Sequence, residues 1–373
     1  MILDVERVAH GGVCIAHAPD GRVVFVRHTL PGEQVRVAVT EERRDYLRAD
    51  AVEVIRAATA RVTAPCPWAG PGRCGGCDWQ HVDLAEQRRL KATVVAEQLR
   101  RLAGLDWDVT VEPAPGDDGL GWRTRLRLAV NADGRAGLHR YRSHEVEPID
   151  NCVIAVPAAR MPDVLTRRWQ PGAEVLVEAS ATGERAVAIG KPSEQLTEHA
   201  GGRDWLVPIG GFWQVHAAAA DVLVDAVMSM VAPRRTDVCL DLYSGVGLFA
   251  GMLAPLVSTV IAVESDSRAV RAARKNVPNV RVVQDRVDRW LRTADMEVDL
   301  VVLDPPRKGA GRSVVEGLVG LAPRAVVYVA CDPAALARDV SHFAAGGYRL
   351  SRLRAFDLFP MTAHVECVAL LER

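Results

Sequence analysis

Residues 238–250 read VCLDLYSGVGLFA, an apolar strand-like run that enters a glycine turn and then a helix-like segment. Glycines such as Gly245 let the backbone approach a ligand at the start of a helix. Glu264 ends the next strand-like run, where a carboxylate can bind ribose hydroxyls, and the Tyr243 ring can cover a ligand in the turn. The segment predicts a nucleotide site at a strand-to-helix turn, and a tight turn without a ligand is the simpler alternative.

Strands and helices alternate on both sides of this turn, from about residue 205 to the C-terminus. Such a rhythm predicts a parallel sheet with right-handed crossovers and helices on both faces, and ligands then belong at the carboxyl ends of the strands. We therefore expect a Rossmann-like domain over residues 206–373. Its expected elements are a helix at 217–231 and strands at 238–242, 259–264, 280–284, 300–303 and 325–330.

Acidic side chains in this domain favour a cationic ligand over a pyrophosphate. The turn fits the dinucleotide fingerprint almost as well as an S-adenosylmethionine site, so a nicotinamide-dependent oxidoreductase stays an alternative. Asp241 inside the turn would repel a pyrophosphate but is compatible with a sulfonium ion. Asp304 and Asp285 follow two further strands and are expected beside the cofactor, Asp285 near the adenine amino group, unless they are helix caps or solvated residues.

A cysteine and a carboxylate near the C-terminus indicate covalent chemistry. Cys331 ends the apolar run 326–330, and the Asp332-Pro333 pair that follows begins a helix whose amides would favour a thiolate. A thiolate that adds to C6 of a uracil ring makes C5 nucleophilic enough to accept a methyl group, and a base must then remove the C5 proton. Glu366 is the candidate base, with His364 as the alternative, and a buried inert thiol is the structural alternative for Cys331.

Three of the eight cysteines lie close together, at positions 66, 74 and 77. Reduced thiols in an unexported chain point to metal binding or catalysis rather than to disulfides. Three thiols need a fourth ligand, and Cys152 is the best candidate from the rest of the chain. The set Cys66, Cys74, Cys77 and Cys152 therefore predicts a [4Fe–4S] cluster or a structural zinc, with a metal-free loop as the alternative.

The rest of the chain divides into two β-rich regions. Residues 1–58 read as short strands separated by turns and predict a small OB-like β-barrel. Residues 59–205 contain the cysteine loop, an amphipathic helix at 84–102 and further strands at 124–130 and 175–179, so we expect a central β-rich domain. The basic side of the helix, which includes Lys91, is expected to be a solvated face. Five arginines of this domain are candidate phosphate contacts, with an ordinary surface charge as the alternative for each: Arg123, Arg125, Arg127, Arg140 and Arg142.

Composition limits the partners. A formal net charge of −1 over 373 residues means that any polyanion site is a local patch rather than the average surface. No apolar run reaches the length of a membrane span, and the charged N-terminus does not look like a leader peptide. We expect a soluble cytoplasmic monomer that does not bind membranes.

These motifs together resemble the TRAM-domain uracil-C5 methyltransferases of tRNA and ribosomal RNA, over nearly the whole length. The N-terminal stretch is similar to the TRAM barrel, and the cysteine loop with Gln80-His81 is similar to the iron–sulfur loop of that family. The segments that match the central domain and the entry to the methyltransferase domain are Trp122-Arg123-Thr124-Arg125, Ser143-His144-Glu145 and Gly211-Phe212-Trp213-Gln214-Val215-His216.

The resemblance implies an S-adenosylmethionine-dependent enzyme that methylates C5 of a uridine in structured RNA, either tRNA or ribosomal RNA. It implies that Gln214 contacts the cofactor together with Tyr243, Glu264 and Asp304, that Cys331 is the nucleophile and that Glu366 is the base. The loop between Cys66 and Cys74 is longer than is usual in the family. Leu248 and His216 replace common asparagines, and Met361 replaces a common glutamine.

Two other functions stay open on the sequence alone. A methyltransferase that modifies a nitrogen of RNA or protein would use the same donor and the Asp304-Pro305-Pro306-Arg307 turn as a polar clamp, without a role for Cys331. An RNA-binding assembly factor would need only the barrel and the metal loop, with a vestigial catalytic domain.

Overall fold

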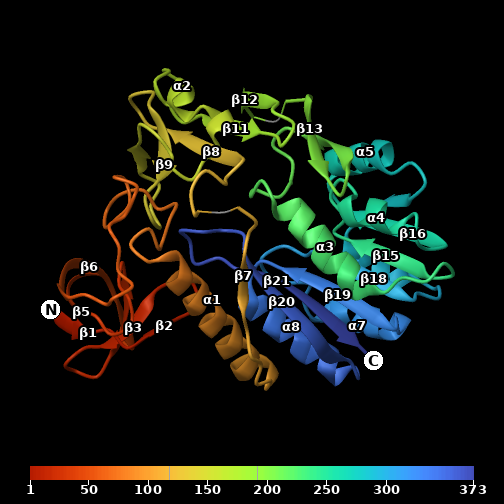
Figure 1. Cartoon of the computed structure of the whole chain (residues 1–373), viewed down its shortest axis with the longest axis horizontal. Helices are drawn as coiled ribbons and strands as arrows, with labels where there is room; N and C mark the ends of the chain where they lie inside the picture. The colour runs from red at the N-terminus through yellow and green to blue at the C-terminus, as the bar shows by residue number, and fades with distance from the viewer. Residues whose placement is uncertain (117, 191) are drawn as a thin grey trace.

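The computed structural model describes residues 1–116, 118–190 and 192–373. Figure 1 shows an N-terminal barrel in red, a central sheet in yellow and green, and a C-terminal α/β body in green to blue. The expected multidomain α/β fold, with a small barrel, a β-rich middle and a Rossmann-like C-terminal part, is confirmed.

The N-terminal barrel is built from a six-stranded sheet in the order β1-β5-β6-β4-β3-β2. Side-chain alternation explains its core, because Val24 and Val26 are fully buried while the other residues of β4 are only partly covered. β4 pairs with β6 in parallel, and the other strand pairs are antiparallel. The strands are β1 (Ile2–Asp4), β2 (Arg7–Val8), β3 (Cys14–His17), β4 (Val23–Arg27), β5 (Gln34–Glu42) and β6 (Tyr46–Arg56).

The central region is a five-stranded sheet in the order β10-β9-β8-β11-β12, followed by the hairpin β13–β14. Both strands that the sequence predicted here are present, as β8 and β11, and they pair with each other in antiparallel register. The elements are β8 (Arg125–Val130), β9 (Ala136–His139), β10 (Val146–Pro148), α2 (Met161–Leu165), β11 (Glu174–Ala179), β12 (Arg185–Ile189), β13 (Gln195–Ala200) and β14 (Arg203–Pro208).

Helix α1 (Leu84–Gln98) continues into a π-helical turn (Leu99–Ala103), so the predicted helix at 84–102 is confirmed. Asp83 begins the helix because its carboxylate accepts hydrogen bonds from two backbone N–H groups of the first turn. The prediction that Lys91 lies on a solvated face is wrong. Lys91 is completely buried, and its Nζ lies 2.5 Å from Oδ1 of Asp357 at the far end of the chain.

The C-terminal body holds an eight-stranded sheet in the order β17-β16-β15-β18-β19-β21-β20-β7. The pairs from β17 to β19 are parallel, whereas β21 is antiparallel to both neighbours. β7 (Val111–Pro113) precedes the central sheet in sequence, so this sheet receives a strand from outside residues 206–373. The other strands are β15 (Val238–Leu242), β16 (Thr259–Glu264), β17 (Arg281–Gln284), β18 (Leu300–Leu303), β19 (Ala325–Ala330), β20 (Arg349–Asp357) and β21 (Glu366–Glu372).

Helices cover both faces of this sheet, as the alternating pattern predicted (Figure 1). Cys239 of β15 packs with the layer of α3, α4 and α5, and its neighbour Leu240 packs with the layer of α1, α7 and α8. The helices are α3 (Ala219–Val231), α4 (Leu248–Leu253), α5 (Ser267–Asn276), α6 (Val287–Trp290), α7 (Arg312–Leu321) and α8 (Pro333–Ala345). Within the described ranges, none of the helices combines the length and apolar character of a membrane span.

Replacing Lys91 with methionine is expected to lower the free energy of unfolding by about 3–5 kcal/mol, because Asp357 would keep a buried charge without its cation. Urea unfolding followed by circular dichroism measures the change. Arg89→Met on the same helix is the control, since Arg89 pairs with Glu86 at the surface and contributes less than about 1 kcal/mol. Equal losses for the two variants would contradict the assignment of Lys91–Asp357 as a structural pair.

Candidate active site

The ends of β15, β16, β18 and β19 and the start of β21 meet at one edge of the C-terminal sheet. Because β21 runs antiparallel to its neighbours, its first residue lies level with the last residues of the parallel strands. This edge carries the predicted polar residues of five strands, which are Tyr243, Glu264, Asp304, Cys331 and Glu366. The fold therefore gathers in space what the sequence spreads over more than a hundred residues.

The glycine turn after β15 is held by two carboxylates. Glu264 accepts a hydrogen bond from the Gly245 N–H at 3.1 Å, and it also accepts from two backbone N–H groups that follow it. Asp241 Oδ2 accepts from the Ala250 N–H in helix α4 at 2.8 Å. Tyr243 adopts a left-handed backbone angle, φ 61°, within this turn. The turn is thus shaped before any ligand binds.

Three acidic groups surround the turn with little access to water. Burial, with a smaller contribution from the charges of Asp304 and Glu264, raises the pKa of Asp241 to about 7. Burial likewise raises the pKa of Asp304 to about 7. Asp241 Oδ1 and Ser244 Oγ have no hydrogen-bond partner in the part of the chain that the structure describes. Such a site favours a ligand with positive charge and hydrogen-bond donors.

Two of the predicted cofactor residues lie at the border of this region. Asp285 directly follows β17, and its backbone N–H donates to the Glu264 carbonyl at 3.0 Å. Its carboxylate accepts from the Arg286 N–H and pairs with Arg289, and these hydrogen bonds lower its pKa. Gln214 lies half-buried in the loop between β14 and α3. Both roles stay predictions.

Cys331 and Glu366 face each other because of strand pairing. β19 and β21 are in register at Ala330 and Cys367, so the residue after β19 lies opposite the residue before Cys367. Burial raises the pKa of Cys331 to about 12, and the nearby charges of Glu366 and Asp304 add to this effect. Burial also raises the pKa of Glu366 well above its usual value.

The amides at the start of α8 do not make Cys331 a thiolate at neutral pH, contrary to the expectation from the sequence. Burial and the neighbouring acidic groups outweigh the helix amides, because removing an anion from water costs more than the partial charge of a helix end returns. The charge of Arg307 lowers the pKa of Cys331 and opposes these effects only in part.

Arg307 is a cation beside Cys331 and Glu366, and the sequence motif did not suggest a role for it in the favoured mechanism. Its charge lowers the pKa of Cys331, Glu366 and His364. Asp339 holds the loop that follows it, accepting from the Ala310 N–H at 2.7 Å. The signal was present in the Asp304-Pro305-Pro306-Arg307 turn, which was considered only as a clamp.

His364 is a poor candidate for the base. Burial lowers its pKa to about 4, so it stays neutral and binds a proton weakly near neutral pH. Its ring packs edge-on against Phe359 with centroids 5.9 Å apart. Between the two predicted bases, the geometry favours Glu366.

The four predicted metal ligands gather in one region without forming a coordination site. Burial raises the pKa of the Cys77 thiol to about 12, and the charges of Cys152, Cys74 and Cys66 contribute, so all four lie within electrostatic range. All are free thiols and half-buried. Among the described residues, no three or more His, Cys, Asp or Glu side chains are arranged to hold a metal ion.

Comparisons with known proteins agree with this geometry. A family model described as tRNA (Uracil-5-)-methyltransferase matches residues 285–373, and a TRAM domain model matches residues 2–52. A Streptomyces avermitilis protein named as an uncharacterized RNA methyltransferase is 50% identical over 99% of this chain and 97% of its own. The 23S rRNA (uracil(1939)-C(5))-methyltransferase RlmD of Pseudomonas putida is 34% identical over 99% of this chain and 93% of its own.

The chain belongs to the RNA uracil-C5 methyltransferase family. A solved structure supports the same assignment for the whole fold. The Pyrococcus abyssi tRNA (uracil-54, C5)-methyltransferase in complex with S-adenosyl-L-homocysteine is 25% identical, with a TM-score of 0.73 over 97% of this chain and 99% of that one. A bound product of the methyl donor in this relative supports S-adenosylmethionine as the donor. The predicted enzyme class is confirmed.

Three departures from the usual family sequence have structural explanations in this methyltransferase. Leu248 and His216 are both buried, and His216 stacks on Trp122 with ring centroids 5.7 Å apart. Met361 adopts a left-handed φ of 65°, and its backbone N–H donates to Gln87 Oε1 at 2.8 Å. Each replacement therefore fills the interior rather than leaving a polar gap.

One of the arginines expected to contact RNA does not face solvent. Arg125 is 8% exposed and lies 3.2 Å from Glu178 and 3.6 Å from Glu198, so the prediction that it contacts phosphate is wrong. Arg140 is engaged by Glu145 and Glu147, although it stays accessible. The other three are Arg123, which donates to the Arg125 carbonyl, Arg127, which is exposed beside Glu174, and Arg142, which lies over Tyr141.

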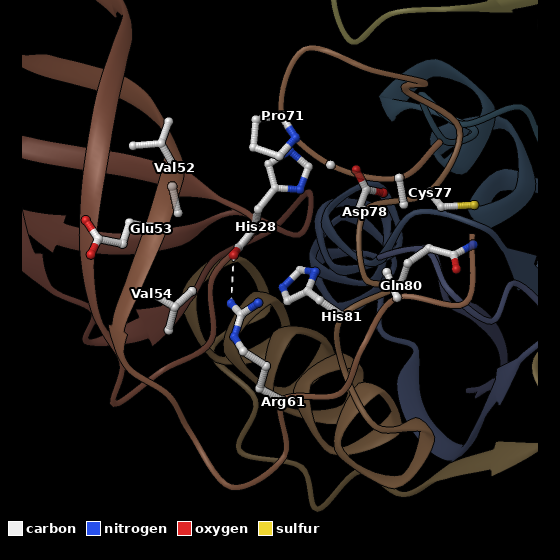
Figure 2. A pocket seen from close by; sticks show the side chains of 14 residues that line it. His28, Val52, Glu53, Val54, Arg61, Pro71, Cys77, Asp78, Gln80 and His81 are labelled. Carbon is white, nitrogen blue, oxygen red and sulfur yellow. Dashed lines mark hydrogen bonds between the residues drawn. The ribbon is translucent and has the colours of Figure 1, made fainter. Parts of the chain in front are cut away.

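A cavity of about 170 Å³ separates the barrel from the cysteine loop (Figure 2). Figure 2 shows His28 and His81 among the side chains that line it, and their ring centroids are 6.2 Å apart. The Arg61 guanidinium donates to the His28 carbonyl oxygen at 2.8 Å. Burial lowers the pKa of His28 to about 3 and that of His81 to about 4, so both rings are neutral. His28 Nε2 has no hydrogen-bond partner among the described residues.

The preference for S-adenosylmethionine over S-adenosylhomocysteine is expected to rise as pH increases. Both Asp241 and Asp304 have a pKa of about 7 without ligand, so raising the pH ionises them and strengthens attraction to the sulfonium. The ratio of the two dissociation constants, measured by titration calorimetry, should change about 3- to 10-fold between about pH 6 and 8.

Asp304→Asn should reduce this pH dependence, whereas Asp285→Asn should leave it unchanged, because its exposed carboxylate has a lowered pKa and is already ionised. A ratio that stays constant with pH in the unmodified enzyme would contradict the assignment of these carboxyls to the donor site.

Proposed function

We propose that this enzyme transfers a methyl group from S-adenosylmethionine to C5 of a uridine in structured RNA through a covalent adduct between Cys331 and C6. The observation that carries the proposal is the placement of Cys331 opposite the buried Glu366, beside a turn that is suited to a cationic nucleotide. A thiol, a base and a donor site are the three parts that activation of C5 needs.

The residues divide the work as follows. The Cys331 thiolate adds to C6, and the electron pair of the C5–C6 bond moves onto C5 and the O4 enolate. Bound S-adenosylmethionine supplies the methyl group to C5 and leaves as the thioether. The Glu366 carboxylate then takes the C5 proton, the C5–C6 double bond re-forms and the thiolate is expelled. A base with a raised pKa holds that proton well.

Arg307 supplies the positive charge that this sequence of steps requires. Cys331 becomes anionic before it attacks, and negative charge then moves to the ring oxygen. Arg307 already lowers the pKa of both Cys331 and Glu366, so it favours ionised forms at this edge of the sheet. In a site shielded from water such a fixed cation stabilises the transition state strongly.

The substrate of this enzyme is proposed to be ribosomal RNA or tRNA, the substrates that the names of its relatives give. The barrel, the exposed Arg127 and Arg142, and the Phe212 side chain, which is 66% exposed in the loop with Gln214, provide charge and a stacking surface. A uridine must leave its stack to reach Cys331, because the thiol lies half-buried at the end of β19.

The covalent step is tested with RNA that carries 5-fluorouridine, because fluorine at C5 cannot leave as a proton and the adduct is trapped. A complex stable to denaturant is expected with S-adenosylmethionine, and Cys331→Ala should abolish it. Cys239→Ala in the buried core is the control and should keep it. Glu366→Gln should lower methylation of normal RNA by about 10²–10⁴-fold while permitting the adduct. An adduct that survives in Cys331→Ala would refute the proposal.

The position of the methyl group is read by mass spectrometry of nucleosides after digestion. 5-Methyluridine is the expected product. A methylated nitrogen would instead favour the alternative in which Cys331 has no chemical role, and RNA binding without any product would favour an assembly factor.

We also propose that Cys66, Cys74, Cys77 and Cys152 hold a [4Fe–4S] cluster, with zinc as the alternative. The set of donors fits, because four half-buried thiols lie within electrostatic range of one another and Arg123 lowers the pKa of two of them. A cluster bound there would link the cysteine loop to the central sheet, since Cys152 comes from that sheet's side and the other three from the loop.

Anaerobically purified protein is expected to contain iron and acid-labile sulfide in equal amounts. Cys152→Ser should lose the metal and lower the melting temperature, because the loop loses its link to the central domain. Cys14→Ser, in the buried core of the barrel, is the control and should keep the metal. Zinc without sulfide would select the alternative, and no metal in either form would refute the site.

A further inference from the structure

A loop of the N-terminal barrel reaches the active site. His10 Nε2 lies 3.0 Å from Asp332 Oδ2, and Asp332 directly follows Cys331. Two residues further along, Gly12 packs so closely that a Cβ there would lie 2.4 Å from Cβ of Ala363. The Gly12 carbonyl oxygen also accepts a hydrogen bond from Trp79 Nε1 at 3.0 Å. The loop is therefore fixed in place rather than resting loosely on the surface.

Asp332 uses its two carboxylate oxygens for different purposes. Oδ1 accepts from the Ala335 N–H at 2.7 Å and so begins helix α8, whereas Oδ2 faces His10. Its charge is one of those that raise the pKa of Cys331. An aspartate directly after a nucleophilic cysteine therefore works against formation of the thiolate, unless a cation compensates it.

We propose that His10 is a positioning residue that pairs with Asp332, offsets its charge and thereby makes the reactivity of Cys331 depend on docking of the barrel loop. The inference rests on the proposed function only in taking Cys331 as the nucleophile. The barrel then contributes to chemistry as well as to RNA binding, through a contact that no sequence spacing reveals.

The charges around both groups are accounted for. The hydrogen bond with Asp332 raises the pKa of His10, and Arg338 of α8 lowers it. Burial would raise the pKa of Asp332, but the bond from His10 and the Ala335 N–H outweigh it and leave the pKa lowered. Burial raises the pKa of Cys331, and the charges of Glu366, Asp304 and Asp332 raise it as well. The charge of Arg307 lowers this pKa and so favours the thiolate.

The sign of the pH dependence follows from these directions. His10 has a raised pKa, so its positive charge is present at low pH and is lost as pH rises through that value. Asp332 stays ionised throughout this range because its pKa is lowered. The effect of His10 on Cys331 is therefore largest in mildly acidic to neutral solution and disappears in alkaline solution.

The test measures the rate at which iodoacetamide alkylates Cys331 in the full-length protein, without RNA or methyl donor, with peptide mass spectrometry to identify the site. His10→Gln keeps a hydrogen-bond donor but removes the charge, and it should slow alkylation about 3- to 10-fold near neutral pH. Asp332→Asn keeps the oxygen that begins α8 and should alkylate at least as fast as the unmodified protein.

The double variant decides the mechanism. In the Asp332→Asn background, His10→Gln should cause no further loss, because the charge that His10 offsets is gone. His17→Gln is the matched control, since His17 pairs with Glu6 at 2.6 Å on the same barrel and should have no effect. Melting temperatures show whether each variant is folded.

Equal slowing by His10→Gln in both backgrounds, or no slowing at neutral pH, would overturn the proposal. Slowing that persists unchanged in alkaline solution would also overturn it, because an uncharged His10 cannot compensate Asp332. In steady-state methylation, His10→Gln should lower kcat, whereas a role in RNA binding alone would raise KM. Alkylation of Cys331 does not involve a uracil. Failure of the 5-fluorouridine test would therefore contradict the proposed function, whereas failure of the alkylation test would contradict only the role of His10.

Discussion

The chemistry proposed for this enzyme depends on the register between β19 and β21. Pairing of Ala330 with Cys367 places Cys331 and Glu366 opposite each other, and a slip of one residue would turn Glu366 to the other face of the sheet. Both strands are buried on both faces, so apolar packing above and below the sheet fixes this register. The position of a proton acceptor is thus determined by the hydrophobic core, far more strongly than by any local turn.

The same burial places acidic groups where they are costly. Asp241, Asp304 and Glu366 share one edge of the sheet, and each has a raised pKa because the charged form has lost water. Grouping these carboxyl groups in a buried site lowers the stability of the fold. Arg307 offsets part of the cost, and a cationic donor would offset more, so ligand binding and ionisation of the nucleophile favour one another. We therefore expect a larger fraction of Cys331 to be ionised when the cationic donor is bound.

Local patterns in the sequence were sufficient to predict where strands end, but they did not predict ion pairs between residues far apart in the sequence. The polar residues after β15, β18 and β19 were found because apolar runs end abruptly there. Lys91 looked like a solvated helix residue, since its partner Asp357 lies at the other end of the chain. Arg125 was misread for the same reason, because Glu178 and Glu198 become its neighbours only when three strands assemble. Periodicity can be read from a single sequence, whereas an ion pair between distant residues cannot.

Hydrogen bonds connect the cysteine loop to the loop that precedes Glu366, the proposed base. Trp79, just after Cys77, donates its backbone N–H to the Met361 carbonyl at 2.9 Å, and the Met361 N–H donates to Gln87 of helix α1. Met361 belongs to the loop that leads into Glu366, so this loop is held by the cysteine region on one side and by α1 on the other. Loss of order around the cysteines would then reach Glu366, the proposed base, through the backbone hydrogen bond between Trp79 and Met361, without any change at Cys331. A metal bound at the proposed site would therefore act on catalysis through position, without a need for electron transfer.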